Sequence, residues 1–344
     1  MSRSAHALHF PVQTPPADGQ PLEIAPGIFW VRFAIPFALT HVNIYLLRDS
    51  DGWVAIDTSA GTDRTHAAWT EIFRFIGGPK SLKRLIITHH HVDHSGAAGW
   101  LMQATGCDVL MAGAERDAMA RSLVPHAPDR AARLVQHLRW LGCAEPEAQD
   151  IPKNIWRIAD YSGPLAGAPQ VIAGGDRLII GGREWLLRTG NGHAPESIML
   201  HCEAENILIA GDQILPTISP FIGVFMEEKD HNPLADYMGF LEDAAHDIPA
   251  DTLVLPGHGL PFAGAGPRLR VLHEHHVARC DLVLETCHAA SSTPRALVDR
   301  LFRRNLDGMM SMALAETMAH VNYLVAEGRL AAETESGALR LKTV

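Results

Sequence analysis

Four candidate metal ligands lie within the six residues from His89 to His94, at the end of an apolar run. The run RLIITH (84–89) has the composition of a buried strand and leads into Thr88-His89-His90-His91-Val92-Asp93-His94. In an extended segment, residues two apart face the same side, so His89 and His91 are predicted to point at one metal ion and His90 away from it. A turn after the strand would bring Asp93 and His94 to a second cation beside the first.

Three further ligand-type residues each follow a predicted strand and are flanked by Gly or Pro. They are His193 in Gly192-His193-Ala194-Pro195-Glu196-Ser197, Asp212 in Gly211-Asp212, and His258 in Pro256-Gly257-His258-Gly259. Gly and Pro fix tight turns and allow close backbone approach, which a ligand loop needs. Imidazole and carboxylate ligands suit Zn²⁺, Fe²⁺ or Mn²⁺, and the missing thiolate argues against a purely structural zinc site.

This order of motifs, H-x-H-x-D-H followed by G-H, G-D and P-G-H-G, resembles the metallo-β-lactamase superfamily over about residues 25–262. The resemblance implies an αββα sandwich with the site at one edge between two sheets. It also implies one metal bound by His89, His91 and His193, and a second bound by Asp93, His94 and His258. Asp212 would bridge both metals. Asp57, at the end of WVAIDT, would stabilise the site by holding the metal ligands in place.

A site of this kind predicts hydrolysis. Two divalent cations about 3.5–4 Å apart can hold a bridging water and lower its pKa toward 7, which supplies hydroxide at neutral pH. One cation can also polarise a carbonyl or phosphoryl oxygen of the substrate. Asp212 is expected to fix the metal separation and Asp93 to help manage the proton of the water, so both are candidate catalytic residues. We therefore expect a binuclear metal-dependent hydrolase, with zinc as the metal and iron or manganese as alternatives.

The elements that must position these residues alternate between strand and helix. Predicted strands are short β-branched and aromatic runs at 28–34, 43–49, 53–58, 84–89, 108–113, 177–190, 197–212 and 251–259, and helices are expected at 64–76 and 96–106. The segments 177–190 and 197–212 are expected to be hairpins. Residues 115–165 interrupt the alternation with two amphipathic helices and an irregular Pro-containing stretch. The pattern predicts a layered α/β catalytic domain over 1–265, with a helical insertion at about 115–165.

From about Pro267 the pattern changes to helices followed by a terminal hairpin. Helices are predicted at 267–289, from Pro294 onward with Thr293 as N-cap, and at 310–327, and the hairpin turns at Glu335-Ser336-Gly337. These elements predict a small winged-helix-like domain over 266–344. Three histidines close together on the first of these helices, His273, His275 and His276, are interpreted as a solvated surface.

The metal ligands alone do not choose the substrate, because they serve acyl transfer and phosphodiester cleavage equally. The first hypothesis is a thioester or ester, similar to the substrates of glyoxalase II and its relatives. The apolar stretch ILPTISPFIGVFM (214–226) directly follows Asp212 and could line an acyl channel. The insertion could act as a lid through Met119, Leu123, Leu134, Leu138 and Trp140. Ordinary core packing explains both features equally well.

The second hypothesis is an endoribonuclease of the β-lactamase-like-protein type, suggested by the domain order. Charge argues against it, because the net charge is −10 and residues 267–344 carry ten Lys and Arg against nine Asp and Glu. The helix in the recognition position, Ser311 to Glu327, has no Lys or Arg. Arginines on the preceding helix are interpreted as a solvated face: Arg295, Arg300, Arg303 and Arg304. We therefore expect a small-molecule substrate rather than nucleic acid, and a packing or dimerisation role for this domain in a homodimer.

The third hypothesis is a β-lactamase, and it is disfavoured because family members with that activity generally lack an aspartate at the bridging position, where this sequence has Asp212. A lactonase is kept as a further alternative, with Tyr237 as a loose candidate for the tyrosine that such enzymes use. The N-terminus has no secretory pattern and no run of about 18 apolar residues occurs. Five scattered cysteines suggest neither a disulfide framework nor a thiolate zinc site. These features predict a cytoplasmic protein without a membrane span.

Overall fold

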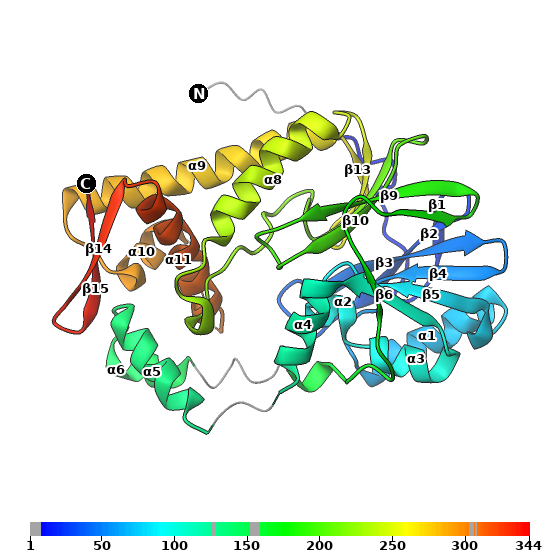
Figure 1. The fold of residues 1–344 in the computed structure, drawn as a ribbon, viewed down its shortest axis with the longest axis horizontal. Helices are drawn as coiled ribbons and strands as arrows, with labels where there is room; N and C mark the ends of the chain where they lie inside the picture. The colour runs from blue at the N-terminus through cyan, green and yellow to red at the C-terminus, as the bar shows by residue number, and fades with distance from the viewer. Residues whose placement is uncertain (1–7, 125–127, 152–158, 303–305, 307) are drawn as a thin grey trace. The chain divides into compact units, whose positions relative to one another are not determined.

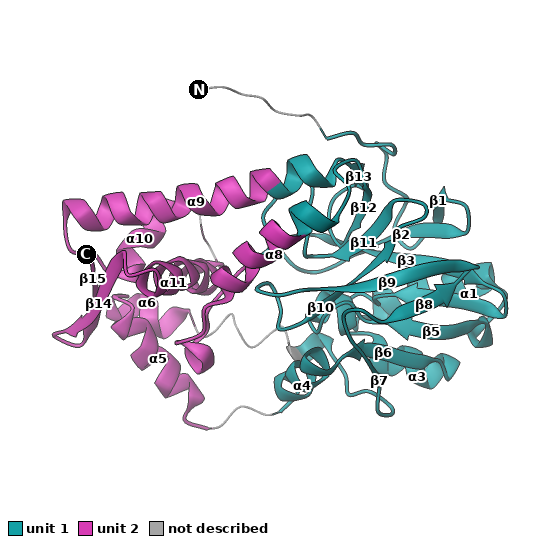
Figure 2. Ribbon diagram, turned by 45° about the horizontal axis from the view of Figure 1, so that its top comes forward, with its two compact units in different colours: residues 1–124, 158–220, 244–269 teal, residues 125–157, 221–243, 270–344 magenta. Residues whose placement is uncertain are grey.

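The computed structural model describes residues 8–124, 128–151, 159–302, 306 and 308–344. The chain forms two compact units (Figure 2), the first from residues 1–124, 158–220 and 244–269 and the second from residues 125–157, 221–243 and 270–344. The units are interleaved in sequence, because the chain passes between them several times. Among the described residues, no helix combines the length and apolar character that crossing a bilayer requires.

The first unit contains a seven-stranded sheet whose strands lie in chain order (Figure 1). Its strands are β1 (Leu22–Ala25), β2 (Ile28–Ala34), β3 (His41–Asp49), β4 (Gly52–Ile56), β5 (Leu82–Ile86), β6 (Asp108–Ala112) and β7 (Gln170–Ile172). Strands β1 to β4 pair antiparallel, and β4 to β7 pair parallel. The loops that follow the carboxyl ends of the parallel strands therefore meet at one edge of the sheet.

A second, six-stranded sheet completes the β structure of this unit. Its strands, in sheet order, are β13 (Phe262–Ala263), β12 (Leu253–Pro256), β11 (Ile207–Gly211), β10 (Ser197–Cys202), β9 (Arg183–Gly190) and β8 (Arg177–Ile180). Strands β8 to β11 form the two predicted hairpins, while β11 and β12 are parallel. Gly181 and Gly182 make the first hairpin turn with φ of 62° and 74°, values that favour glycine.

The core lies between the two sheets and beneath two helices. Trp30 and Tyr45 of the first sheet pack with Trp185 and Leu187 of the second in one buried cluster. A second cluster packs the other face of the seven-stranded sheet against α1 (Asp63–Ile76) and α3 (Ala98–Thr105). Shorter helices connect the layers: η1 (Pro79–Ser81), α2 (Val92–Ser95), α4 (Gly113–Ser122) and η2 (Ala159–Tyr161). The predicted layered α/β class is confirmed.

The second unit is mainly helical. Its elements are α5 (Arg130–Trp140), α6 (Glu145–Asp150), η3 (Met226–Glu228), α10 (Pro294–Leu301), α11 (Met310–Ala326) and the hairpin β14 (Leu330–Glu335) with β15 (Ala338–Thr343). Helices α8 (Pro233–Asp247) and α9 (Ala265–Ala289) each contribute residues to both units. Polar contacts link two segments of this unit, residues 125–157 and residues 270–344. Trp140 Nε1 donates to Thr334 Oγ1 at 3.0 Å, and Arg295 Nε donates to Glu147 Oε1 at 2.7 Å.

Several predictions of local structure are confirmed and others are wrong. Thr293 caps α10 as expected, since its Oγ1 accepts from the backbone N–H of Ala296. The stretch predicted to be irregular after the two insertion helices contains helix α6 instead. The interpretation of the late histidines as solvated is wrong for His276, which is fully buried. Arg303 and Arg304 lie outside the described residues.

Candidate metal centre

The motif from His89 to His94 occupies a loop and a short helix rather than a strand end. Strand β5 ends at Ile86, three residues before the first ligand, and His91 is the N-cap of α2, which carries Asp93 and His94. The strand alternation assumed for His89 and His91 therefore does not apply. The loop nevertheless brings His89 Nε2 to 3.1 Å from His91 Nδ1.

The remaining predicted ligands follow strands of the second sheet. His193 lies in the loop between β9 and β10, Asp212 comes directly after β11, and His258 comes after β12. Gly257 allows this approach, because a Cβ atom at that position would meet Asp212 Oδ1 and would lie 2.8 Å from His94 Cε1. The predicted placement of these three residues after strands is confirmed.

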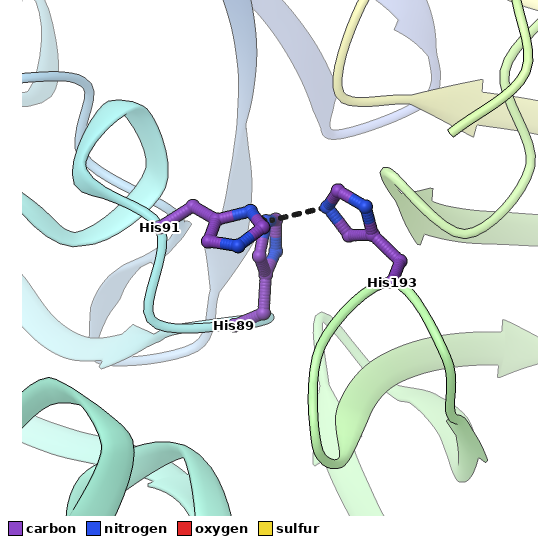
Figure 3. A group of neighbouring side chains, drawn as sticks. All are labelled: His89, His91 and His193. Carbon is purple, nitrogen blue, oxygen red and sulfur yellow. Dashed lines mark hydrogen bonds between the residues drawn. The ribbon is translucent and has the colours of Figure 1, made fainter. Parts of the chain in front are cut away.

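Three histidines form the first group of ligand-type atoms (Figure 3). His193 Nε2 lies 3.2 Å from His89 Nε2, and the ring of His91 faces the same point from the other side. One nitrogen of each residue lies within 4.8 Å of the other two. His89 and His193 are buried, so a cation here would have little contact with bulk water on their side.

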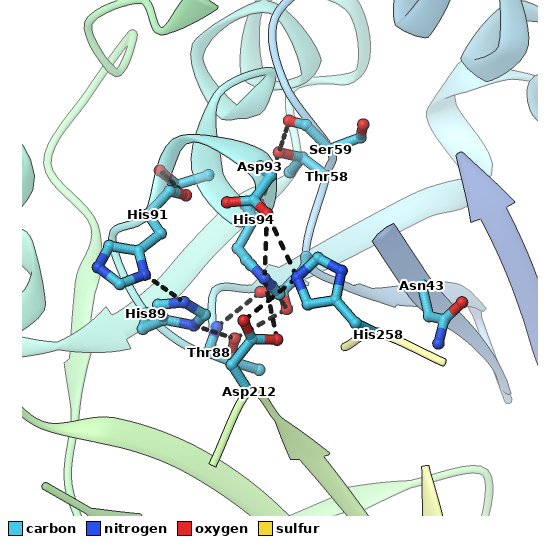
Figure 4. A network of polar contacts seen from close by, with 12 residues as sticks. Asn43, Thr58, Ser59, Thr88, His89, His91, Asp93, His94, Asp212 and His258 are labelled. Carbon is cyan, nitrogen blue, oxygen red and sulfur yellow. Dashed lines mark hydrogen bonds and ion pairs between the residues drawn. The ribbon is translucent and has the colours of Figure 1, made fainter. Parts of the chain in front are cut away.

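The second group combines carboxylates with imidazoles (Figure 4). Asp212 Oδ1 lies 3.2 Å from His94 Nε2, and its Oδ2 lies 3.2 Å from His258 Nε2. Asp93 Oδ2 lies 3.3 Å from the same His258 nitrogen. Asp212 also reaches toward the first group, because its Oδ2 is 3.7 Å from His193 Nε2. The structure thus brings all seven predicted ligands together, with Asp212 between the two groups.

Asp57 orients the ligands from a buried position behind them. Its carboxylate accepts hydrogen bonds at 2.8 Å from His94 Nδ1, from the backbone N–H of Thr88 and from Thr88 Oγ1. Thr88 Oγ1 in turn lies 3.0 Å from His89 Nδ1. These contacts direct the Nε2 atoms of His89 and His94 into the centre. The backbone of Asp57 has φ of 66°, a left-handed conformation that costs free energy in a non-glycine residue.

Strand β3 holds the loop of His258. His258 Nδ1 donates to the carbonyl oxygen of His41 at 2.6 Å, which leaves Nε2 directed at the carboxylates. Asn43 Nδ2 donates to Pro256 O and Gly259 O at 2.9 Å, on either side of His258. Sequence reasoning missed this role of Asn43. The sequence did contain a signal for this role, because Asn43 is a polar residue within the apolar run of β3 and a buried amide requires hydrogen-bond partners.

The electrostatics differ between the two groups. Burial, together with neighbouring imidazoles, lowers the pKa of His89 and of His91 well below 6.5, which keeps them neutral and able to ligate. Burial opposes ionisation of Asp93, but His94 and His258 outweigh it and lower the pKa of Asp93 to about 2. Burial likewise opposes a charge on His258, yet Asp212 and Asp93 raise its pKa to about 10. The carboxylates of the second group therefore favour a positive charge beside them.

The residues fit a pair of divalent cations. Tetrahedral ligands at about 2.1 Å from a zinc ion are separated by about 3.4 Å, close to the contacts within each group. Among the described residues, Nε2 of His94, Nε2 of His258 and Oδ1 of Asp212 are buried atoms without an aligned hydrogen-bond partner. Buried polar atoms of this kind are rare unless an ion or water completes them.

Comparison with known proteins agrees with this geometry. Residues 38–258 match the family model described as the metallo-beta-lactamase superfamily. The chain belongs to this superfamily. Residues 280–344 match the model described as the metallo-beta-lactamase-like C-terminal domain. The predicted family, the fold class and the assignment as a hydrolase are therefore confirmed.

Individual relatives cover most of the chain. A beta-lactamase domain protein from Burkholderia ambifaria is 34% identical, matches 98% of both chains and has a TM-score of 0.90. A metallo-beta-lactamase family protein from Thermus thermophilus is 27% identical, with a TM-score of 0.79 over 94% of this chain and 100% of its own. The acyl-coenzyme A thioesterase MBLAC2 of Bos taurus is 26% identical over 77% of this chain and 88% of its own length.

Proposed function

We propose that the chain is a binuclear metal-dependent thioesterase that hydrolyses a small-molecule acyl thioester. The observation that carries the proposal is the convergence of seven ligand-type side chains, from loops far apart in sequence, into adjoining groups. In this proposal, His89, His91 and His193 hold one cation, Asp93, His94 and His258 hold the other, and Asp212 contacts both. The named activity of the cattle relative supports the acyl thioester as substrate.

The proposed cations, zinc with iron or manganese as alternatives, would supply Lewis acidity toward the thioester carbonyl and lower the pKa of a bound water. Asp212 holds the two groups of ligands at a fixed separation, because its Oδ1 faces His94 of the second group while its Oδ2 also lies 3.7 Å from His193 of the first. Asp93 has a more exposed side chain than Asp212, 16% against 7%. We therefore propose that Asp93, besides being a ligand, helps to manage the proton of the attacking water.

The segment after Asp212 is proposed to contact the acyl group. Ile214 and Leu215 are buried and belong to the core, whereas Ile218 is 40% exposed. Arg268 fixes this segment, because its guanidinium donates to the carbonyl oxygens of Leu215 and Ile218. Ile218 thus offers an apolar contact on a backbone that is already ordered.

The remaining parts of the chain are proposed to have supporting roles. We propose a catalytic domain over residues 1–265 and a winged-helix-like domain over 266–344 that serves packing or homodimer formation. Helix α11 (Met310–Ala326) carries no Lys or Arg, which argues against a groove-binding role. Tyr237, the loose lactonase candidate, is fully buried and its ring packs against His276.

Metal content and a substrate panel test the proposal together. Purified protein is analysed for zinc, iron and manganese per chain, and is assayed with an acyl-CoA, a glutathione thioester, a lactone, a chromogenic cephalosporin and single-stranded RNA. Two cations with thioester turnover support the proposal, while cleavage of RNA alone would replace it with the endoribonuclease hypothesis. His258→Ala should lose turnover, whereas His231→Ala, which changes an exposed histidine, should keep it.

A further inference from the structure

Glu115 is a buried acid that has no place among the proposed ligands. It lies in the first turn of α4 and is one of three buried acidic side chains among the described residues. The other two, Asp57 and Asp212, already belong to the centre. Burial of a carboxylate costs free energy unless hydrogen-bond donors surround it, so its donors indicate its role.

The two oxygens of this carboxylate reach two separate loops. Oε2 accepts from the backbone N–H of His90 at 2.8 Å and lies 2.6 Å from the Nδ1 atom of the same residue. Oε1 accepts from the backbone N–H of Glu196 at 2.7 Å. His90 lies between the two ligands of its loop, and Glu196 follows His193 by three residues. One carboxylate therefore connects the two loops that carry the three-histidine group.

The other group of ligands is supported by other residues. Asp57 orients His94, and the backbone of His41 together with Asn43 holds the loop of His258. Among the described residues, the hydrogen bonds of Glu115 reach neither α2 nor the loop of His258. Asp57 contacts both groups, His94 directly and His89 through Thr88, whereas the hydrogen bonds of Glu115 support the three-histidine group alone.

We infer that Glu115 is a positioning residue for the cation of the three-histidine group. It sets the distance between the His89–His91 loop and the His193 loop before a cation binds. Hydrogen bonds from backbone N–H groups to a carboxylate are short and directional, and ligands held in advance bind with less loss of freedom. The inference rests on the proposed metal centre.

Glu115→Gln tests the inference with little change of shape. The amide keeps an acceptor for the N–H of Glu196 but turns an NH₂ group toward the N–H of His90. We expect one of the two zinc ions to bind roughly 10–100-fold more weakly in a competitive chelator titration, and the other to bind unchanged. Glu196→Gln is the matched control, because it removes the same charge while its backbone N–H is kept, and it should bind both ions as the wild type does.

Two ligand variants identify which cation is affected. In His258→Ala protein, which retains the three-histidine group, adding Glu115→Gln should weaken the remaining zinc ion by the same factor. In His193→Ala protein, the same addition should leave the affinity of the remaining zinc ion unchanged. The absorption spectrum of each cobalt(II)-loaded protein gives a second readout, because it responds to ligand geometry rather than to global stability.

The outcomes separate the inference from the proposed function. Equal weakening in both backgrounds, or no weakening in either, overturns the positioning role. A wild-type protein that binds fewer than two cations overturns the metal centre itself, and the inference with it. If Glu115→Gln does not fold, Glu115→Asp keeps the charge but is one methylene shorter, and it should weaken binding in the His258→Ala background alone.

Discussion

His276 and His320 form a buried pair in the second unit that we predict to be sensitive to acid. His320 Nδ1 donates to the carbonyl oxygen of Glu316 at 2.8 Å, so its Nε2 is the acceptor for His276 Nδ1 at 3.3 Å. Protonation of His320 would place two N–H groups against each other. Burial, with smaller contributions from nearby cationic groups, lowers the pKa of His276 to about 2, and burial lowers that of His320 to about 3.

The direction and size of the effect follow from these values. In the unfolded chain a histidine has a pKa of about 6.5, so between pH 6.5 and about 3 the unfolded chain binds more protons than the folded one. Stability is unaffected by the pair above pH 6.5 and falls as the pH drops below it. Below pH 6.5, each of the two imidazoles lowers the free energy of unfolding by about 1.4 kcal/mol per pH unit. Together they therefore lower it by about 5 kcal/mol at pH 4.5.

Several other groups face the pair and must be considered in the assay. His273, His275 and Arg279 lower the pKa of His276 electrostatically, Glu316 forms an ion pair with Arg279 at 2.6 Å, and the ring of Tyr237 packs on His276. These groups are present in both proteins that are compared, so a difference between wild type and variant isolates the pair.

Urea unfolding of wild type and of the His276→Leu/His320→Leu double variant, followed by circular dichroism from pH 7.5 to 4.5, measures this difference. Between pH 6.5 and 4.5, the decrease in the free energy of unfolding should be about 5 kcal/mol smaller for the variant than for the wild type. The control variant His246→Gln/His288→Gln changes two exposed histidines and should keep the wild-type pH dependence. Parallel pH profiles for the wild type and the double leucine variant would refute the reasoning.

Three further predictions concern the proposed centre. Asp212→Ala should lose at least one cation and most hydrolysis, measured by metal analysis and thioester turnover; full values of both would contradict the bridging role. His90→Ala should keep the wild-type metal stoichiometry, because its backbone N–H still donates to Glu115; a lost cation would show that the ring itself ligates. Gly257→Ala should lower metal content through displacement of Asp212, since its Cβ would meet Asp212 Oδ1; wild-type content would mean that the loop adjusts without cost.

Much of the first unit could be predicted from local sequence pattern. Strand β2 occupies the predicted range 28–34, and α1 begins one residue before its predicted start. These elements are recognisable because their apolar periodicity agrees with their burial. Three ligands, His193, Asp212 and His258, were recognisable because Gly or Pro flanks them after apolar runs, and the other four because they lie within six residues.

The elements that were missed depend on distant partners. Strand β13 has only two residues, Phe262 and Ala263, and exists because β12 pairs with it. Glu115 resembles a solvated residue in the sequence GAERDA, and only its donors from distant loops make it a buried carboxylate. His276 was misjudged for the same reason, since its burial depends on residues of α8 and α11.

The interleaving of the second unit has a consequence for synthesis of the chain. Leu134 and Leu138 of α5 are buried in the finished protein, and the N–H of Arg295 bonds to Leu141 O at the end of that helix. At a translation rate of about 5–20 residues per second, α5 leaves the ribosome roughly 10–30 s before α10 is made. During that interval its apolar face has no late partner to cover it. We expect nascent chains halted before residue 290 to be retained by chaperones, and completed chains to be released.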